Sequence, residues 1–274
     1  MDSKRIIVPT DFSTAADQAI VQAVAIARKA GVSLTLLHVM NPGSSAGSKS
    51  DIAVVESELQ KQVEKIENEG VRCNYSVTTG SIFHAIPEIS NHPENYMLVI
   101  GTHGIQGLKQ KMFGADILKL VRKISIPCLI VQEACSCNQF SPIVFPVGGH
   151  EGFRQLIEAT AMMAGLFEAE VHIYAVERKG DPATAKIREN ILLAEKIFTE
   201  RSIPHQCIKE ASNIISVGYA RQTLQYANAT GAGLISMMSV KSEEHYYIAQ
   251  ADKETMINNA FNIPVLCISG LLNE

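Results

Sequence analysis

The stretch L-V-I-G-T-H-G-I-Q-G-L-K-Q-K-M-F-G-A-D, residues 98–116, begins as an apolar run and continues as a glycine-rich loop. The apolar run extends back to Tyr96 and predicts a buried strand that ends in glycine. Residues without a side chain recur through the loop, at Gly101, Gly104, Gly107 and Gly114.

Two of these glycines stand at the ends of the loop. Gly101 closes the predicted strand, and Gly114 directly precedes a helix predicted over residues 115–123. Glycine at these points permits positive φ and a close approach of the backbone, which suits a loop whose N–H groups surround an anion such as phosphate. The alternative is a turn that only connects strand to helix. The spacing matches neither a P-loop nor a Rossmann dinucleotide fingerprint.

The residues around this loop alternate between strand and helix patterns, which predicts a parallel sheet covered on both faces. In such sheets ligands bind beyond the carboxyl ends of the strands. The predicted strands are 5–10, 33–39, 72–80, 96–101 and 127–132, and the predicted helices are 14–30, 52–68, 82–91 and 115–123.

The pattern occurs twice in the chain. I-I-V-P-T-D-F at 6–12 resembles I-V-F-P-V-G-G at 143–149, and S-I-P-C-L-I-V at 125–131 resembles N-I-P-V-L-C-I at 262–268. The matching prolines are 137 positions apart in both cases, which indicates a duplicated domain. We expect domains at 1–134 and 142–274, joined by a linker at 135–141.

Composition and charge exclude several classes of protein. The 274 residues are 46% hydrophobic and 19% charged, as in a globular protein with a substantial core. A net charge of -4 offers no overall positive field for nucleic acid or anionic lipid. No apolar run approaches the roughly 18 residues of a membrane span, and the first residues lack the apolar core of a signal peptide. We expect a cytoplasmic protein that binds neither nucleic acid nor membrane.

Two further motifs should lie beside the glycine loop. P-T-D-F-S at 9–13 ends the first predicted strand, and L-L-H-V-M at 36–40 ends the second. Asp11 offers a carboxylate for ribose or adenine donors, and the Val39 backbone can pair with the edge of adenine. The simpler role for Asp11 is capping the helix that begins near Ser13.

On these motifs, and on the spacing Gly101-x2-Gly104-x9-Gly114, the chain resembles the universal stress protein family. The resemblance implies two tandem five-stranded parallel α/β sandwich domains of the adenine nucleotide alpha hydrolase-like type. It also implies ATP or AMP as the ligand of the first half. The implied binding residues are Pro9, Thr10, Asp11, Val39, Gly101, His103, Gly104, Gly114 and Ala115.

One position departs from the family pattern. Members that bind ATP have Ser or Thr after the last glycine of the loop, where this chain has Ala115, so one hydroxyl contact to phosphate is missing. Asp116 adds a negative charge nearby, which a divalent ion such as Mg²⁺ or Mn²⁺ would screen. Both changes should weaken nucleotide binding.

The second half keeps its strand patterns and loses the site motifs. Val147, Gly148 and Gly149 replace T-D-F, and S-M-M-S-V-K-S-E at 236–243 replaces the glycine loop. We interpret it as a degenerate pseudo-subunit. The resemblance implies pairing through the last strands, as an internal pseudo-dimer or a homodimer.

Catalytic chemistry has little support in the sequence. His38 and His103 follow strands near the expected site, but neither has the partners of a triad or a carboxylate pair. We expect His103 to contact phosphate and His38 to pack at the strand tip. Two hypotheses remain: a stress-response or signalling module that binds ATP or AMP with little or no turnover, and a nucleotide-free scaffold acting through dimerisation or partner binding. Slow ATP hydrolysis stays open in the first.

The six cysteines are too few for a disulfide framework in a chain of this length. Four lie in or beside strand patterns and should be core residues: Cys73, Cys128, Cys207 and Cys267. Cys135 and Cys137 fall in the expected linker, where we predict reduced surface thiols. A soft-metal site there would need a second pair of ligands that the sequence lacks.

Overall fold

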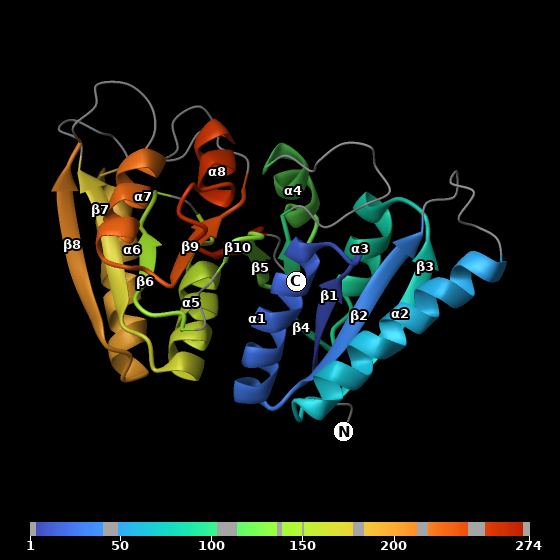
Figure 1. The fold of residues 1–274 in the computed structure, drawn as a ribbon. Helices are drawn as coiled ribbons and strands as arrows, with labels where there is room; N and C mark the ends of the chain where they lie inside the picture. The colour runs from blue at the N-terminus through green and yellow to red at the C-terminus, as the bar shows by residue number, and fades with distance from the viewer. Residues whose placement is uncertain are drawn as a thin grey trace. The chain divides into compact units, whose positions relative to one another are not determined.

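The structure is a computed structural model that describes residues 4–40, 49–102, 114–135, 139–149, 151–177, 184–212, 219–240 and 250–270. The chain divides into two compact units, Met1–Cys135 and Ser136–Glu274. Each unit contains a parallel sheet with helices on both faces (Figure 1). The predicted fold class, a tandem pair of parallel α/β domains, is confirmed.

The first unit has the strand order β3-β2-β1-β4-β5, with every pairing parallel. Because the crossover from β1 to β2 runs in the opposite direction to that from β3 to β4, α1 and α2 cover one face while α3 and α4 cover the other (Figure 1). The elements are β1 Arg5–Pro9, α1 Thr14–Ala30, β2 Ser33–Met40, α2 Lys49–Asn68, β3 Cys73–Thr79, α3 Ile82–Ser90, β4 Asn95–Gly101, α4 Gly114–Val121 and β5 Cys128–Val131.

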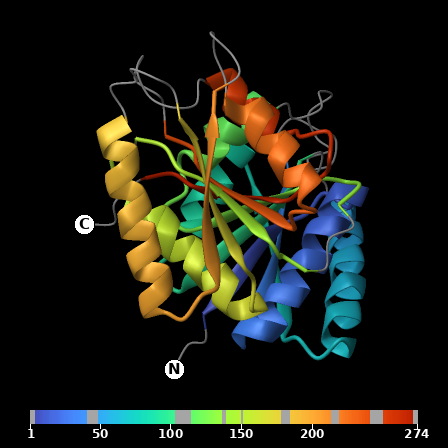
Figure 2. The same ribbon diagram turned by 90° about the vertical axis from the view of Figure 1, so that its left-hand side faces the viewer.

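The second unit repeats this topology. Its strands lie in the order β8-β7-β6-β9-β10. Strands β6 to β10 are the counterparts of β1 to β5, so this is the order of the first unit. Helices α5 and α6 cover one face and α7 and α8 the other (Figure 1 and Figure 2). The elements are β6 Ile143–Pro146, α5 Phe153–Phe167, β7 Val171–Glu177, α6 Thr184–Glu200, β8 His205–Ala211, α7 Tyr219–Ala229, β9 Leu234–Met238, α8 Gln250–Ile257 and β10 Val265–Ile268.

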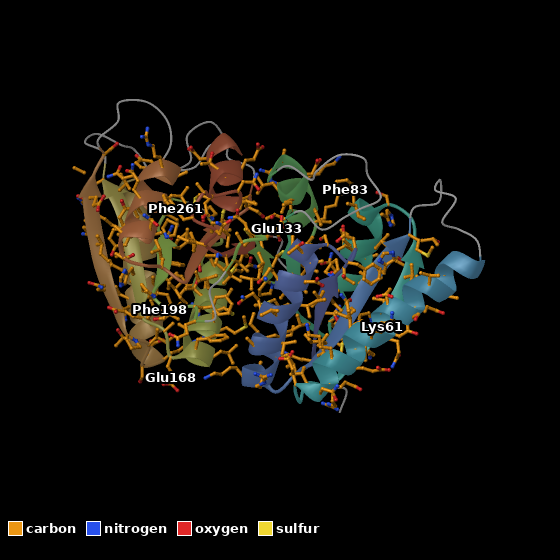
Figure 3. All side chains as sticks on the ribbon, viewed as in Figure 1. Lys61, Phe83, Glu133, Glu168, Phe198 and Phe261 are labelled. Atoms are coloured by element: carbon orange, nitrogen blue, oxygen red, sulfur yellow. The ribbon has the colours of Figure 1, made fainter. Side chains whose placement is uncertain are left out.

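Apolar side chains fill the space between sheets and helices (Figure 3). The central strands are buried on both faces, so residues 97–100 of β4 form an unbroken apolar run instead of an alternating one. In the second unit, Phe198 of α6 is buried and packs edge-on against Phe145 of β6, with ring centroids 5.8 Å apart. Lys61 of α2, by contrast, is exposed.

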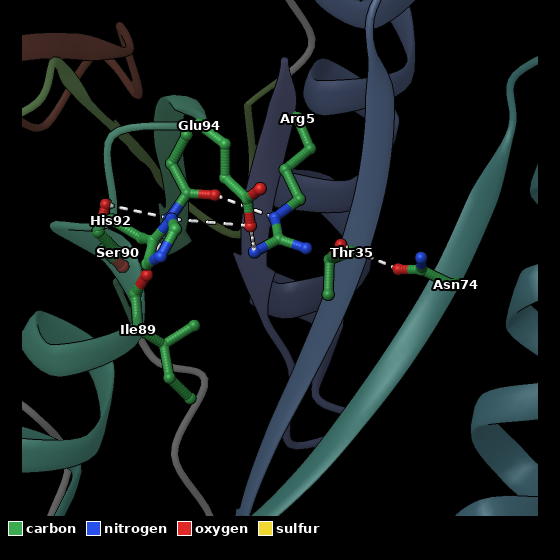
Figure 4. Close-up of polar contacts among 8 residues, drawn as sticks. Arg5, Thr35, Asn74, Ile89, Ser90, His92 and Glu94 are labelled. Carbon is green, nitrogen blue, oxygen red and sulfur yellow. Dashed lines mark hydrogen bonds and ion pairs between the residues drawn. The ribbon is translucent and has the colours of Figure 1, made fainter. Parts of the chain in front are cut away.

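A polar cluster ties β1, β4 and α3 together at the amino ends of the two strands (Figure 4). The Asn95 side chain, 5% exposed, donates to the carbonyls of Ile89 and Ser90 at 2.6 and 3.1 Å, which satisfies acceptors that the end of α3 leaves open. Its Oδ1 accepts from Arg5 Nε at 2.9 Å, and Arg5 also forms an ion pair with Glu94. One buried amide therefore joins three elements.

We predict that Asn95→Ala lowers the free energy of unfolding by about 1–3 kcal/mol, because it leaves buried carbonyls and the Arg5 guanidinium without this partner. Urea denaturation measures the change. Asn74→Ala is the matched control, since the side chain of exposed Asn74 accepts from Thr35 Oγ1 at 2.7 Å (Figure 4), and its loss should cost less than about 1 kcal/mol. Equal losses in the two variants would contradict the structural role of Asn95.

Candidate functional site

The site lies where the connections of the first sheet change direction, between β1 and β4. Strand β1 pairs with β2 through Pro9 and Leu37, and with β4 through Ile7 and Leu98. The chain leaves β1 for a helix on one face and leaves β4 for a helix on the other. The strands separate at this point, and the crevice beyond their carboxyl ends is where open α/β sheets bind ligands.

Residues 10–13 form the turn from β1 into α1 and are held by hydrogen bonds within the turn and to β2. The Thr10 N–H donates to the Leu37 carbonyl at 2.9 Å, and the Phe12 N–H donates to Thr10 Oγ1 at 3.2 Å. Asp11 Oδ1 accepts from the Ser13 N–H at 3.0 Å. These contacts fix the turn at the carboxyl end of β1.

The helix cap differs from the one that we expected for Asp11. Ser13 is the N-cap of α1, with Oγ accepting from the Ala16 N–H at 3.2 Å. Asp11 stands two residues earlier and bonds the N–H of the cap residue, because the turn places its carboxylate before the first turn of the helix. Asp11 is 9% exposed, so a carboxylate lies almost buried at the carboxyl end of β1.

Of the two properties for which glycine was expected at position 101, the structure uses the close approach of the backbone. The φ of Gly101 lies outside the left-handed region, so the positive φ that glycine permits is not used. A Cβ atom on Gly101 would lie 2.4 Å from the carbonyl oxygen of Ala15 and 2.5 Å from its carbonyl carbon. The bare backbone therefore admits the first turn of α1, which packs directly on the end of β4.

The other predicted residues are spread over β1, the turn after it, β2 and α4, or lie outside the described part of the chain. Pro9 ends β1, Thr10 is buried in the turn, and Val39 is half-buried in β2. Gly114 and exposed Ala115 form the first turn of α4, whose N-terminus faces the carboxyl edge because α4 returns the chain from β4 to β5. His103, Gly104 and Gly107 lie outside the described residues.

Phe12 and His38 make a contact that the sequence did not suggest. Phe12 has φ 65°, which is uncommon for a bulky residue and marks a strained turn. Its ring stacks on the His38 imidazole, with centroids 5.1 Å apart and planes 26° apart. His38 Nδ1 lies 2.8 Å from the Thr10 carbonyl oxygen. We expected His38 only to pack at the strand tip, and no local pattern signals its pairing with residues 28 and 26 positions earlier.

In the second unit, internal side chains occupy the matching edge of the sheet. Val147, Gly148 and Gly149 follow β6, and the Gly148 carbonyl accepts from buried Asn190 of α6 at 2.7 Å. Lys253 of α8 is 0% exposed, and its ammonium donates to the Val240 carbonyl just beyond β9. Where the first unit has the Asp11 carboxylate, the second has Gly148, as the sequence indicated.

Two predictions about cysteines are corrected. Cys135 is 4% exposed, because the chain after β5 turns back so that its N–H donates to the Gln132 carbonyl. Cys207 is exposed, because it lies on the edge strand β8. Cys73, Cys128 and Cys267 are buried as expected, and burial raises the pKa of the Cys73 thiol to about 12. Cys137 lies outside the described residues.

The described residues contain neither of two further features of function, a metal cluster and a membrane-spanning helix. They contain no group of three or more His, Cys, Asp or Glu side chains that could hold a metal ion. No helix among the elements defined above is both long and apolar enough to cross a membrane.

The universal stress protein family model matches residues 2–132. A universal stress protein from Archaeoglobus fulgidus DSM 4304 has a similar structure, with a TM-score of 0.76, 17% identity, and coverage of 99% of this chain and 100% of its own. A candidate universal stress protein from Pseudomonas aeruginosa UCBPP-PA14 follows at 0.65, with 16% identity and coverage of 97% and 93%. At these identities the likeness shows the fold of the whole chain. No curated protein matches the sequence.

Gly101→Ala should lower the free energy of unfolding by about 3 kcal/mol, since its methyl group would overlap the Ala15 backbone, which cannot move without shifting α1. Thermal and urea denaturation measure the loss. Gly165→Ala serves as the control, because this exposed glycine of α5 has open space around its Cβ position and should gain about 0.5–1 kcal/mol of stability. A fully stable Gly101→Ala variant would show that α1 does not pack on β4 as described.

Proposed function

The chain belongs to the universal stress protein family through residues 2–132, and on that basis we propose that its first unit binds one adenine nucleotide, ATP or AMP. In this proposal the protein is a stress-response or signalling module with little or no catalytic turnover. The observation that carries it is the nearly buried Asp11 carboxylate at the point where β1 and β4 separate. A carboxylate there can accept hydrogen bonds from ribose hydroxyls or the adenine amino group.

The backbone of β2 supports the same placement. The Thr10 N–H donates to the Leu37 carbonyl, so Leu37 directs its backbone groups toward β1. In a parallel strand these directions alternate, and Val39, two residues on, therefore presents its N–H and carbonyl to the same side, beyond the end of β1. Such a donor and acceptor pair is complementary to the edge of adenine.

The phosphates are assigned to the loop between Gly101 and Gly114. Its last residue begins α4, whose N-terminal amides and dipole favour an anion. Asp116, in the first turn of α4, is the residue that a Mg²⁺ or Mn²⁺ ion accompanying ATP would approach. The proposal has His103 and Gly104 as further phosphate contacts.

The second candidate function is a nucleotide-free scaffold that acts by dimerisation or partner binding. Its support is the second unit, where Asn190 and Lys253 bond backbone carbonyls at the carboxyl edge of the sheet, the edge at which a ligand would bind. Within the first proposal, we infer that the second unit serves association and does not bind a nucleotide.

We expect the freshly purified, denatured protein to release an adenine nucleotide that mass spectrometry identifies, and isothermal titration to give one site per chain.

Asp11→Ala should weaken binding at least tenfold, because a hydrogen bond to a charged group contributes about 1.5–3 kcal/mol. Asp116→Ala should retain AMP affinity, since that residue is placed near the outer phosphates. Two equal sites would contradict the assignment of the second unit, and no binding at all would favour the scaffold.

Ala115→Ser should raise the affinity for ATP by about tenfold and for AMP by much less. The new hydroxyl stands in the first turn of α4, where it can donate to an outer phosphate, and exposed Ala115 leaves room for it. Titration of both nucleotides into the two proteins measures the difference. Unchanged ATP affinity in the folded variant would mean that the phosphates do not lie at the start of α4.

A further inference from the structure

We propose that His38 is a positioning residue of the nucleotide site, and that its imidazole holds the turn that carries Asp11. This inference rests on the proposed function. The Thr10 carbonyl oxygen lies 2.8 Å from His38 Nδ1. A carbonyl oxygen only accepts hydrogen bonds, so Nδ1 carries the proton and donates. In the neutral ring, Nε2 is then the nitrogen with the lone pair.

The face of the same ring holds a second residue of the turn. Phe12 stacks on His38 with nearly parallel planes, 5.1 Å between centroids, while its backbone has φ 65°. A bulky residue adopts this conformation only where its surroundings enforce it. The stack on His38 and the bond from the Phe12 N–H to Thr10 Oγ1 are the contacts that do so here.

Asp11 lies between these two residues in the chain. The edge of the imidazole binds Thr10 before it, and the face of the imidazole packs on Phe12 after it. Asp11 has few ways to rotate out of its place while both neighbours are held, and its Oδ1 is further oriented by the Ser13 N–H. Preorganisation of this kind lowers the entropy lost on binding.

This role differs from the two roles that the sequence suggested for His38. A residue that only fills space at the strand tip would not need a nitrogen at the Nδ1 position. A general base would act through the lone pair of Nε2, whereas the positioning role uses only the Nδ1 donor and the face of the ring. The geometry instead uses both the edge and the face of the ring to fix one turn.

Three substitutions separate these two contacts. Asn places an amide N–H near the position of Nδ1 and lacks the ring, so His38→Asn keeps the bond to Thr10. His38→Phe keeps the ring face for Phe12 and loses the donor. His38→Ala loses both. We expect adenine nucleotide affinity to fall about tenfold or more in His38→Ala and by a smaller factor in His38→Asn and His38→Phe.

Asn95→Ala is the matched control, since it removes a buried amide at the opposite end of β4 and should reduce stability without reducing affinity. Titrations are done at a temperature where all variants are folded. In parallel, ¹⁵N NMR of the neutral imidazole in the nucleotide-free wild-type protein should show a protonated Nδ1 and an unprotonated Nε2.

The outcomes separate this inference from the proposed function. Unchanged affinity in all three His38 variants, or an equal loss in Asn95→Ala, overturns the positioning role and leaves nucleotide binding intact. A neutral ring protonated at Nε2 instead of Nδ1 overturns it without any nucleotide. A wild-type protein that binds no adenine nucleotide refutes the proposed function, and the positioning role fails with it.

Discussion

The close packing of α1 on the end of β4 is the constraint on which the first unit's site depends. The Ala15 carbonyl occupies the space that any side chain at position 101 would need, so the end of β4 must be glycine. This approach brings the start of α1 to the point where β1 and β4 separate. The turn with Asp11, Phe12 and Ser13 lies at this point because the helix that follows it is fixed there.

The fold could be predicted from the sequence because its determinants are local or repeated. Residues 97–100 are apolar without alternation since both faces of β4 are buried, and this identifies a central parallel strand. The interval between Pro9 and Pro146 identifies a second copy of the domain. Neither inference requires knowledge of which residues touch.

The errors concern contacts between residues distant in the chain or a choice between neighbouring residues. The close approach at Gly101 was expected to serve an anion, because its actual partner, Ala15, lies 86 positions earlier and cannot be inferred from the loop. Asp11 and Ser13 are both good caps, and only the path of the turn decides that Ser13 is used. The contact of His38 with Phe12 likewise depends on the pairing of β1 with β2.

Buried Lys253 has a thermodynamic consequence for the duplicated chain. Its ammonium is satisfied within the second unit, by the Val240 carbonyl among other contacts, so that unit supplies its own charged group at the edge of its sheet. A ligand stabilises only the state that binds it, by an amount that grows with its concentration. With a nucleotide bound only in the first unit, the unfolding free energy of that unit would follow the cellular nucleotide level while that of the second would not. If the first unit binds a nucleotide as proposed, the duplication would join a unit that the ligand stabilises to one that it does not.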